Sequence, residues 1–143
     1  MRNLLRIVVM TAFSLTATGI FSGCSKENAD VKKINVAAMM EALKGEDKDA
    51  RINACVELAK AGPRAAPAVQ ALIGTLKDAD PTVRRLAAYT LGEIGPEAKP
   101  ALSALKELMN DPDRQVVMQV VNSLRSIDPK NNSDMKNVSV TGP

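Results

Sequence analysis

Residues 80–98 read DPTVRRLAAYTLGEIGPEA, and this stretch decides the fold. Asp80 followed by Pro81 is a typical helix start, because the carboxylate caps free N–H groups and proline suits the first turn. Apolar side chains then recur at the spacing of one helix face, at Val83, Ala87, Leu91 and Ile94. Gly95-Pro96 ends the pattern, since glycine accepts a left-handed cap and proline cannot continue a helix. The stretch therefore predicts one amphipathic helix between two breaks.

The same pattern returns every 33 residues. Residues of matching type stand at Pro63, Pro96 and Pro129; at Asp47, Asp80 and Asp113; at Leu58, Leu91 and Leu124; and at Leu43, Leu76 and Met109. A second apolar stripe at residues 67–77 predicts a helix before the turn at residues 78–81. We therefore predict an all-α fold, a short α-solenoid of about three helix-turn-helix units at residues 32–63, 67–96 and 100–129.

Residues 80–98 resemble the short HEAT-like repeat first associated with phycobilisome lyases, in which Asp and Val-Arg are followed by Leu-Gly and Ile-Gly. The resemblance covers residues 31–130, although the third copy has Val117 in place of the Arg. Ankyrin repeats would bring a Thr-Pro-Leu-His signature, but the chain has no His. Tetratricopeptide repeats need aromatic side chains, which form only 2% of this sequence.

In HEAT-like arrays an Asp and an Arg typically form a ladder between neighbouring repeats. By this resemblance the ladder here would comprise Asp47, Asp80 and Asp113 with Arg51 and Arg84. We expect these residues to be structural, to fix the stacking of the repeats and to cap the helices.

The first 24 residues, MRNLLRIVVMTAFSLTATGIFSGC, indicate export. Arg2 and Arg6 precede an apolar stretch that is shorter than the roughly 20 residues of a membrane-spanning helix. Phe21-Ser22-Gly23-Cys24 resembles the lipobox of bacterial lipoproteins, with Phe21 where Leu is usual. This implies a signal peptide at 1–23, lipid and fatty-acyl (palmitate-type) groups on Cys24, and anchoring to the bacterial membrane. Where there are two membranes, we expect the periplasmic side of the outer one.

The alternative is an ordinary signal peptide, with Cys24 free or bonded to Cys55. On either interpretation residues 24–31 would be a flexible tether, and residues 130–143 a disordered tail.

The net charge of +3 is mostly a property of the signal, because Arg2 and Arg6 leave with it. A nearly neutral mature chain is not expected to bind nucleic acid.

No catalytic constellation is visible in the sequence. Without His, the chain lacks the commonest general base and metal ligand. Cys55 is expected to pack as a small hydrophobic residue, and the alternative is a reactive or chromophore-carrying thiol. Cys clusters with metal spacing and glycine-rich phosphate loops are absent from the sequence. We therefore expect no enzyme activity, no cofactor and no metal.

The second helices present a candidate partner-binding strip. At about 100° per residue, Arg85 and Tyr89 point away from the apolar stripe. With their equivalents in the other repeats, the strip comprises Ile52, Val56, Arg85, Tyr89, Met118 and Asn122. Apolar side chains at exposed positions, and Tyr and Arg above all, are typical of protein interfaces. The alternative is that helix packing or the tail covers these residues.

We interpret the chain as a membrane-anchored, non-enzymatic scaffold that holds a protein or peptide partner. One alternative is chromophore handling, as in the phycobilin lyases that the repeat resembles. Export and the short array oppose that alternative. Another is a structural envelope lipoprotein. The sequence identifies neither the partner nor the oligomeric state.

Replacing Cys24 by Ala should abolish fatty-acyl labelling and release the protein from the membrane fraction. The reason is that each buried acyl methylene contributes about 0.8 kcal/mol to membrane binding. Metabolic labelling with a palmitate analogue, followed by membrane fractionation, measures both effects, and Cys55→Ala should change neither. A Cys24→Ala protein that stays acylated and membrane-bound would refute the assignment.

Overall fold

A computed structural model describes residues 34–130, which are helical throughout except for short turns. The elements are α1 (Val36–Ala42), α2 (Lys48–Ala61), η1 (Gly62–Ala68), α3 (Val69–Thr75), α4 (Pro81–Ile94), η2 (Gly95–Ala101), α5 (Leu102–Glu107), η3 (Leu108–Asn110) and α6 (Arg114–Ile127), where η marks a 3₁₀ helix. No strand occurs between residues 34 and 130, which confirms the all-α prediction. The predicted signal peptide, Cys24, the tether to residue 31 and the tail beyond residue 130 lie outside these residues.

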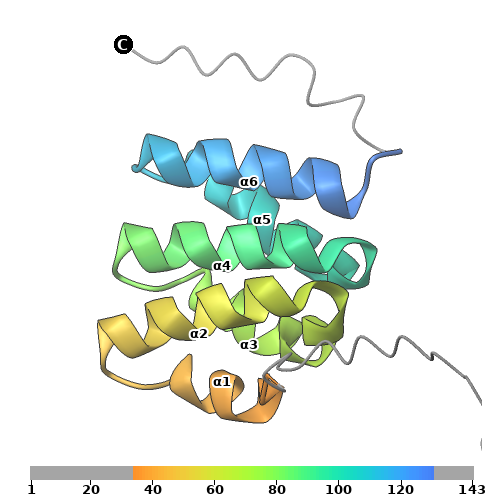
Figure 1. The fold of residues 1–143 in the computed structure, drawn as a ribbon. Coiled ribbons are helices and arrows are strands. Elements are labelled where there is room, and N and C mark those ends of the chain that lie inside the picture. Colours follow the sequence, from red (N-terminus) through yellow and green to blue (C-terminus); the bar gives the residue numbers. More distant parts are fainter. Residues whose placement is uncertain (1–33, 131–143) are drawn as a thin grey trace, which may run out of the picture. The chain divides into compact units, whose positions relative to one another are not determined.

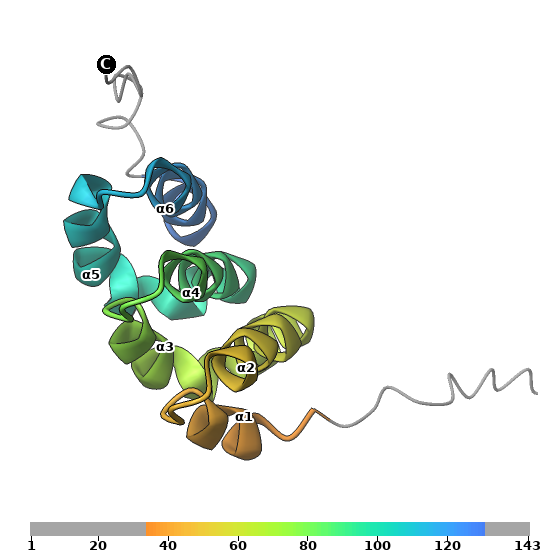
Figure 2. The ribbon, with the colours of Figure 1, turned by 90° about the vertical axis from the view of Figure 1, so that its left-hand side faces the viewer.

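The helices form two rows (Figures 1 and 2). The long helices α2, α4 and α6 lie side by side in one row, where α4 packs against both of the others. The short helices α1, α3 and α5 form the other row, each next to the long helix that follows it. Figure 2 shows that the row of long helices lies on the inner side of the curve. The short helices therefore leave one face of this row uncovered.

Each long helix begins at the predicted aspartate. Asp47, Asp80 and Asp113 are the N-caps of α2, α4 and α6, and their side chains accept hydrogen bonds from backbone N–H groups of the first turn. The ends of α2 and α4 fall at Gly62 and Gly95, with φ of 56° and 78°. A left-handed backbone favours glycine, so the chain can turn directly into the next repeat.

The first helix of a repeat is shorter than predicted. Pro67 falls within the 3₁₀ helix η1, and the α-helix that follows ends at Thr75. A proline has no N–H to donate and fixes its own φ, so the segment with Pro63 and Pro67 adopts the tighter 3₁₀ form. The linkers between the predicted repeats are therefore helical as well, and they bury alanines such as Ala65 and Ala98.

The core consists of small and aliphatic side chains from both rows. Val83, Ala87, Leu91 and Ile94, the predicted inner face of α4, are all fully buried. Leu58 and Leu124 occupy the equivalent of Leu91 in the neighbouring repeats and are buried too. The described residues contain no Phe or Trp, so helices approach closely enough for aliphatic side chains to interdigitate.

The ladder between repeats uses other carboxylates than predicted. Arg51 Nε and Nη2 donate to the carboxylate of Asp78 at 2.7 and 3.3 Å, and Arg84 pairs with Asp111 at 2.8 and 2.9 Å. Asp78 and Asp111 lie two residues before the N-caps Asp80 and Asp113, in the turn that faces the preceding repeat. The N-cap carboxylates accept from backbone N–H groups of their own helices. The guanidinium meets the earlier aspartate, whose carboxylate also accepts from the N–H of the N-cap residue.

Each ladder arginine also donates hydrogen bonds to backbone carbonyl oxygens of the turn before its own helix. Arg84 Nη1 donates to the carbonyl oxygens of Asp78 and Ala79 at 2.8 and 3.0 Å, so one side chain makes four hydrogen bonds. The hydrogen bond from Arg84 holds the pKa of Asp111 below its ordinary value, while Asp111 raises the pKa of Arg84. Only 13% of the Arg84 side chain and 6% of the Asp111 side chain are exposed, which shields the pair from screening.

The ladder stops at both ends of the array. The first repeat has Gly45 at the position of Asp78, and the third has Val117 at the position of Arg84. No repeat precedes Gly45 or follows Val117 in the described residues, so an ionic group at either place would have no partner. The loss of Arg in the third copy is thus explained by its terminal place.

A second set of links joins the long helices at mid-length. Thr90 Oγ1 lies 2.9 Å from the carbonyl oxygen of Cys55, and Ser123 Oγ lies 2.6 Å from that of Ala88. Both hydroxyls are buried and reach one repeat back. Together with the ladder they fix the register of α2, α4 and α6.

Replacing Arg84 by Ala should lower the free energy of unfolding by about 2–4 kcal/mol, because Asp111 then remains buried without its partner. Urea denaturation of the full chain in the Cys24→Ala background, followed by helical circular dichroism, measures the change. The depressed Asp111 pKa means that the pair stabilises above the ordinary Asp pKa, and that this stabilisation is lost as pH falls through the folded-state value.

The matched control is Arg64→Ala in η1, an exposed arginine outside the ladder, which should cost less than about 0.5 kcal/mol. Equal losses in the two variants, or an Arg84→Ala loss that does not shrink in acid, would argue against the ladder.

Candidate functional site

The predicted partner-binding strip lies along α2, α4 and α6. Tyr89 is 40% exposed and Met118 is 52% exposed, and they are the exposed large hydrophobic residues among residues 34–130. Asn122 is exposed as well, whereas Ile52, Val56 and Arg85 are half-buried. The strip is therefore open on α4 and α6 and more covered on α2.

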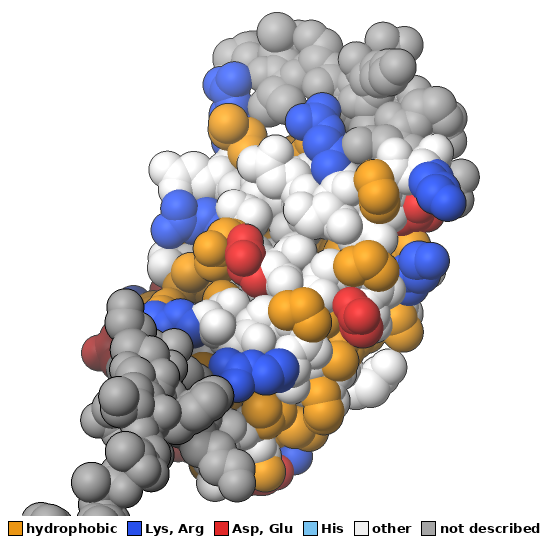
Figure 3. Space-filling view, turned by 45° about the vertical axis from the view of Figure 1, so that its right-hand side comes forward, with side chains coloured by type: hydrophobic (Ala, Val, Ile, Leu, Met, Phe, Trp, Pro, Cys, Tyr) orange, Lys and Arg blue, Asp and Glu red, His pale blue; other side chains and the backbone are white. Residues whose placement is uncertain are grey.

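Charge on the molecular surface is mixed. Figure 3 shows acidic and basic side chains interspersed with hydrophobic ones on the face that it presents. A nucleic-acid site would bring a cluster of Lys and Arg on one face.

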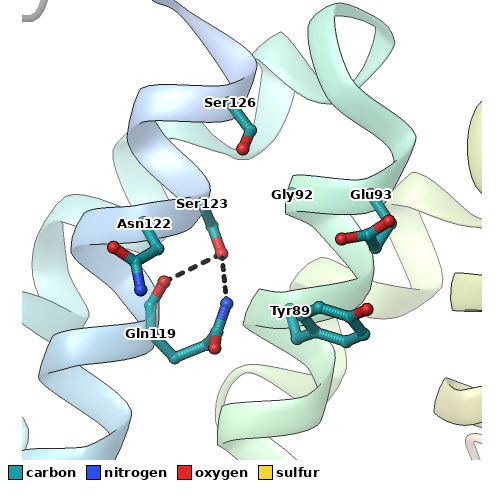
Figure 4. Close-up of a pocket in the computed structure, with 7 residues that line it drawn as sticks. All are labelled: Tyr89, Gly92, Glu93, Gln119, Asn122, Ser123 and Ser126. Atoms are coloured by element: carbon teal, nitrogen blue, oxygen red, sulfur yellow. Dashed lines mark hydrogen bonds between the residues drawn. The ribbon is translucent and has the colours of Figure 1, made fainter.

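A hollow of about 210 Å³ lies between α4 and α6, beside the exposed Tyr89. Its lining residues are Tyr89, Gly92 and Glu93 from α4, with Gln119, Asn122, Ser123 and Ser126 from α6 (Figure 4). The sequence had singled out Tyr89 and Asn122, and it missed Gly92, Gln119 and Ser123. The one available signal was Gly92 in the Leu-Gly pair of the repeat, which marks a close approach of helices without showing what approaches.

Gly92 sets how closely the two helices that line the hollow can approach each other. A Cβ atom there would lie 3.0 Å from Ser123 Oγ and 3.1 Å from Ser123 Cα, too close for an unstrained contact. Gly92 therefore allows α6 to approach α4. The two helices are then near enough for Ser123 to reach the carbonyl oxygen of Ala88.

Gln119 and Ser123 are linked by hydrogen bonds inside the hollow. Gln119 Nε2 donates to Ser123 Oγ at 3.3 Å, and the single Ser123 hydroxyl proton lies between the carbonyl oxygens of Ala88 and Gln119, at 2.6 and 2.9 Å (Figure 4). One turn earlier, Arg85 Nη1 donates to Gln115 Oε1 at 3.3 Å and joins the same two helices outside the hollow.

Tyr89 and Glu93 form a pair one helical turn apart on α4. The negative charge of Glu93 raises the pKa of the Tyr89 phenol above its ordinary value, with smaller contributions from burial and from a hydrogen bond to the carboxylate. Figure 4 shows the phenol oxygen on the same side as Glu93.

Cys55 is fully buried on α2, where it packs in the core. The pKa of its thiol is raised to about 12, chiefly by burial, while the nearby Asp78 raises it and Arg51 lowers it to a smaller extent. A buried, protonated thiol is a poor nucleophile, which supports packing over reactivity for this residue. Its suggested partner Cys24 lies outside the described residues.

Residues 34–130 contain no cluster of three or more acidic or Cys side chains arranged to hold a metal ion. No helix in that range is long and apolar enough to cross a bilayer.

Helix pairs stacked into two rows and joined through repeating contacts define an α-solenoid. A family model for HEAT repeats matches residues 36–130, and the chain therefore belongs to the HEAT repeat family. The match is to HEAT repeats in general and does not select the lyase type. No curated protein matches the sequence. HEAT repeats commonly mediate protein–protein binding.

The Tyr89 phenol should titrate above the value of about 10 found for free tyrosine, because ionisation places a second negative charge beside Glu93. Glu93→Gln should bring the pKa down towards that value. The ultraviolet absorbance of tyrosinate reports this residue directly, since the chain has a single Tyr and no Trp.

Glu107→Gln on α5 removes an equal charge from an exposed position in the other row and should leave the titration unchanged. If the Tyr89 pKa does not change in Glu93→Gln, or changes equally in Glu107→Gln, the Tyr89 and Glu93 side chains do not face each other.

Proposed function

We propose that this chain is a non-enzymatic binding module, anchored to the bacterial envelope through lipid on Cys24, which holds a protein partner on the face of α4 and α6. The observation that carries the proposal is the exposure of Tyr89 and Met118 beside a polar hollow on one face of a rigid repeat array.

Physical chemistry favours a protein as the occupant of this face. A tyrosine offers a large rigid surface with a polar tip, and methionine adapts to an irregular partner. Both residue types are enriched in protein interfaces. Because the ladder and the buried hydroxyls fix α4 against α6, little conformational entropy is lost when a partner binds there.

The anchor half of the proposal rests on residues 21–24. Their resemblance to a lipobox supports lipid attachment at Cys24 and placement at the outer membrane, on its periplasmic side, in a cell with two membranes. Ser25 follows the cysteine, and resemblance to lipoprotein sorting signals then favours the outer membrane.

A photo-cross-linking amino acid tests the face in living cells. With p-benzoylphenylalanine replacing Met118, we expect discrete adducts of one or a few proteins after irradiation, identified by mass spectrometry. The matched control places the same residue at Ser103, an exposed position of α5 in the other row, where no such adduct is expected.

Two further results decide between a binding module and a structural lipoprotein. A binding module should form the same adduct in the Cys24→Ala background when the partner is supplied in solution. Absence of adducts at position 118, or equal adducts at 118 and 103, would refute the binding face and favour a purely structural role.

A further inference from the structure

The hollow between α4 and α6 presents more acceptors than donors. Gln119 Nε2 is bound to Ser123, and the Ser123 hydroxyl is bound to backbone carbonyl oxygens. The Tyr89 hydroxyl faces Glu93. What remains for a ligand is the Glu93 carboxylate, the Gln119 side-chain oxygen and its second N–H, and the donors and acceptors of Asn122 and Ser126. The oxygens offer more acceptor sites than there are free donors, so a ligand rich in hydrogen-bond donors suits the hollow.

The negative charge of the hollow favours a cationic ligand. Glu93 is exposed and is the one charged residue among those that line it. On α2, Lys60 pairs with Glu57 at 2.7 Å, and on α4, Arg85 donates to Gln115. Within residues 34–130 no ion pair joins Glu93 to a basic residue, so its charge is available to a partner.

An aromatic ring lies next to this carboxylate. A cation over the face of a tyrosine ring gains about 0.5–1 kcal/mol at an exposed site. Tyr89 and Glu93 come from adjacent turns of α4, so a single cation can reach both.

The size of the hollow limits what can enter it. Its volume of about 210 Å³ is below the roughly 300–1,000 Å³ of sites that hold drug-sized ligands or cofactors. One long side chain fits this space better than a whole small molecule.

We propose that the hollow binds a lysine or arginine side chain of the partner protein, with the cation between the Tyr89 ring and the Glu93 carboxylate and its N–H groups directed at Gln119 and Asn122. The ammonium and guanidinium groups carry donors and no acceptor, which suits the Glu93 carboxylate and the amide oxygens of the hollow. This inference rests on the proposed function and names the chemistry that the partner must present.

Peptide titration of the full chain in the Cys24→Ala background tests the proposal. The emission of Tyr89, the single tyrosine, is followed while acetyl-Gly-Ala-Lys-Ala-Gly-amide is added, alongside versions with arginine, norleucine or glutamate in the central place. We expect weak saturable binding of the lysine and arginine peptides, and none of the norleucine and glutamate peptides. Glu93→Gln should weaken binding of the lysine peptide about fivefold, and Glu107→Gln should leave it unchanged.

Equal binding of the norleucine peptide would overturn the proposal in favour of apolar recognition. Stronger binding of the glutamate peptide would overturn it as well, because the hollow would then prefer an acidic side chain. Insensitivity to Glu93→Gln would overturn it too. These outcomes are separate from failure of the proposed function. If adducts form at position 118 but basic peptides do not bind, the face is an interface with another specificity. If adducts are also absent, the interface itself is refuted.

Discussion

An arginine guanidinium in one repeat forms a bidentate ion pair with an aspartate carboxylate in the next, and the spacing of the three long helices depends on this contact. Arg84 holds both oxygens of Asp111 while it closes its own turn through two carbonyl oxygens. Bidentate pairs of this kind are directional as well as strong, so they set the angle between neighbouring repeats. An isolated helix pair could not bury its apolar face. The ladder joins each pair to the neighbouring repeat that completes its core.

Small groups complete what the ladder begins. Gly92 leaves room for Ser123 between α4 and α6, and the Ser123 hydroxyl crosses to Ala88. Gly92 and Ser123 also line the hollow, where the Ser123 hydroxyl and one Gln119 N–H are engaged in hydrogen bonds. Stability and recognition chemistry at this face thus arise from one set of close contacts. A side chain at position 92 would alter both.

The repeat and its core could be predicted from the sequence, because the spacing of Val83, Leu91 and Ile94 reports directly on helix faces. An Asp–Arg ladder could be predicted, but not which aspartates it uses. Asp80 and Asp78 both lie before α4 and both accept hydrogen bonds from backbone N–H groups, so the choice between them depends on which carboxylate the stacking brings to Arg51. The hollow could not be predicted, since it requires the packing distance between two repeats. Of the predicted strip, Tyr89, Met118 and Asn122 on α4 and α6 are exposed, whereas Ile52 and Val56 on α2 are half-buried.

Native-state hydrogen exchange of the full chain tests most directly whether the ladder joins the repeats into one unit. We predict that the most protected amides of α2, α4 and α6 exchange with a common opening free energy, and that Arg84→Ala lowers this free energy for α6 more than for α2. Common protection would mean that the binding face exists only when all three repeats are folded. If α6 instead opened about 2 kcal/mol or more below α2 and α4 in the unaltered protein, the repeats would be independent and the ladder would not be the constraint described above.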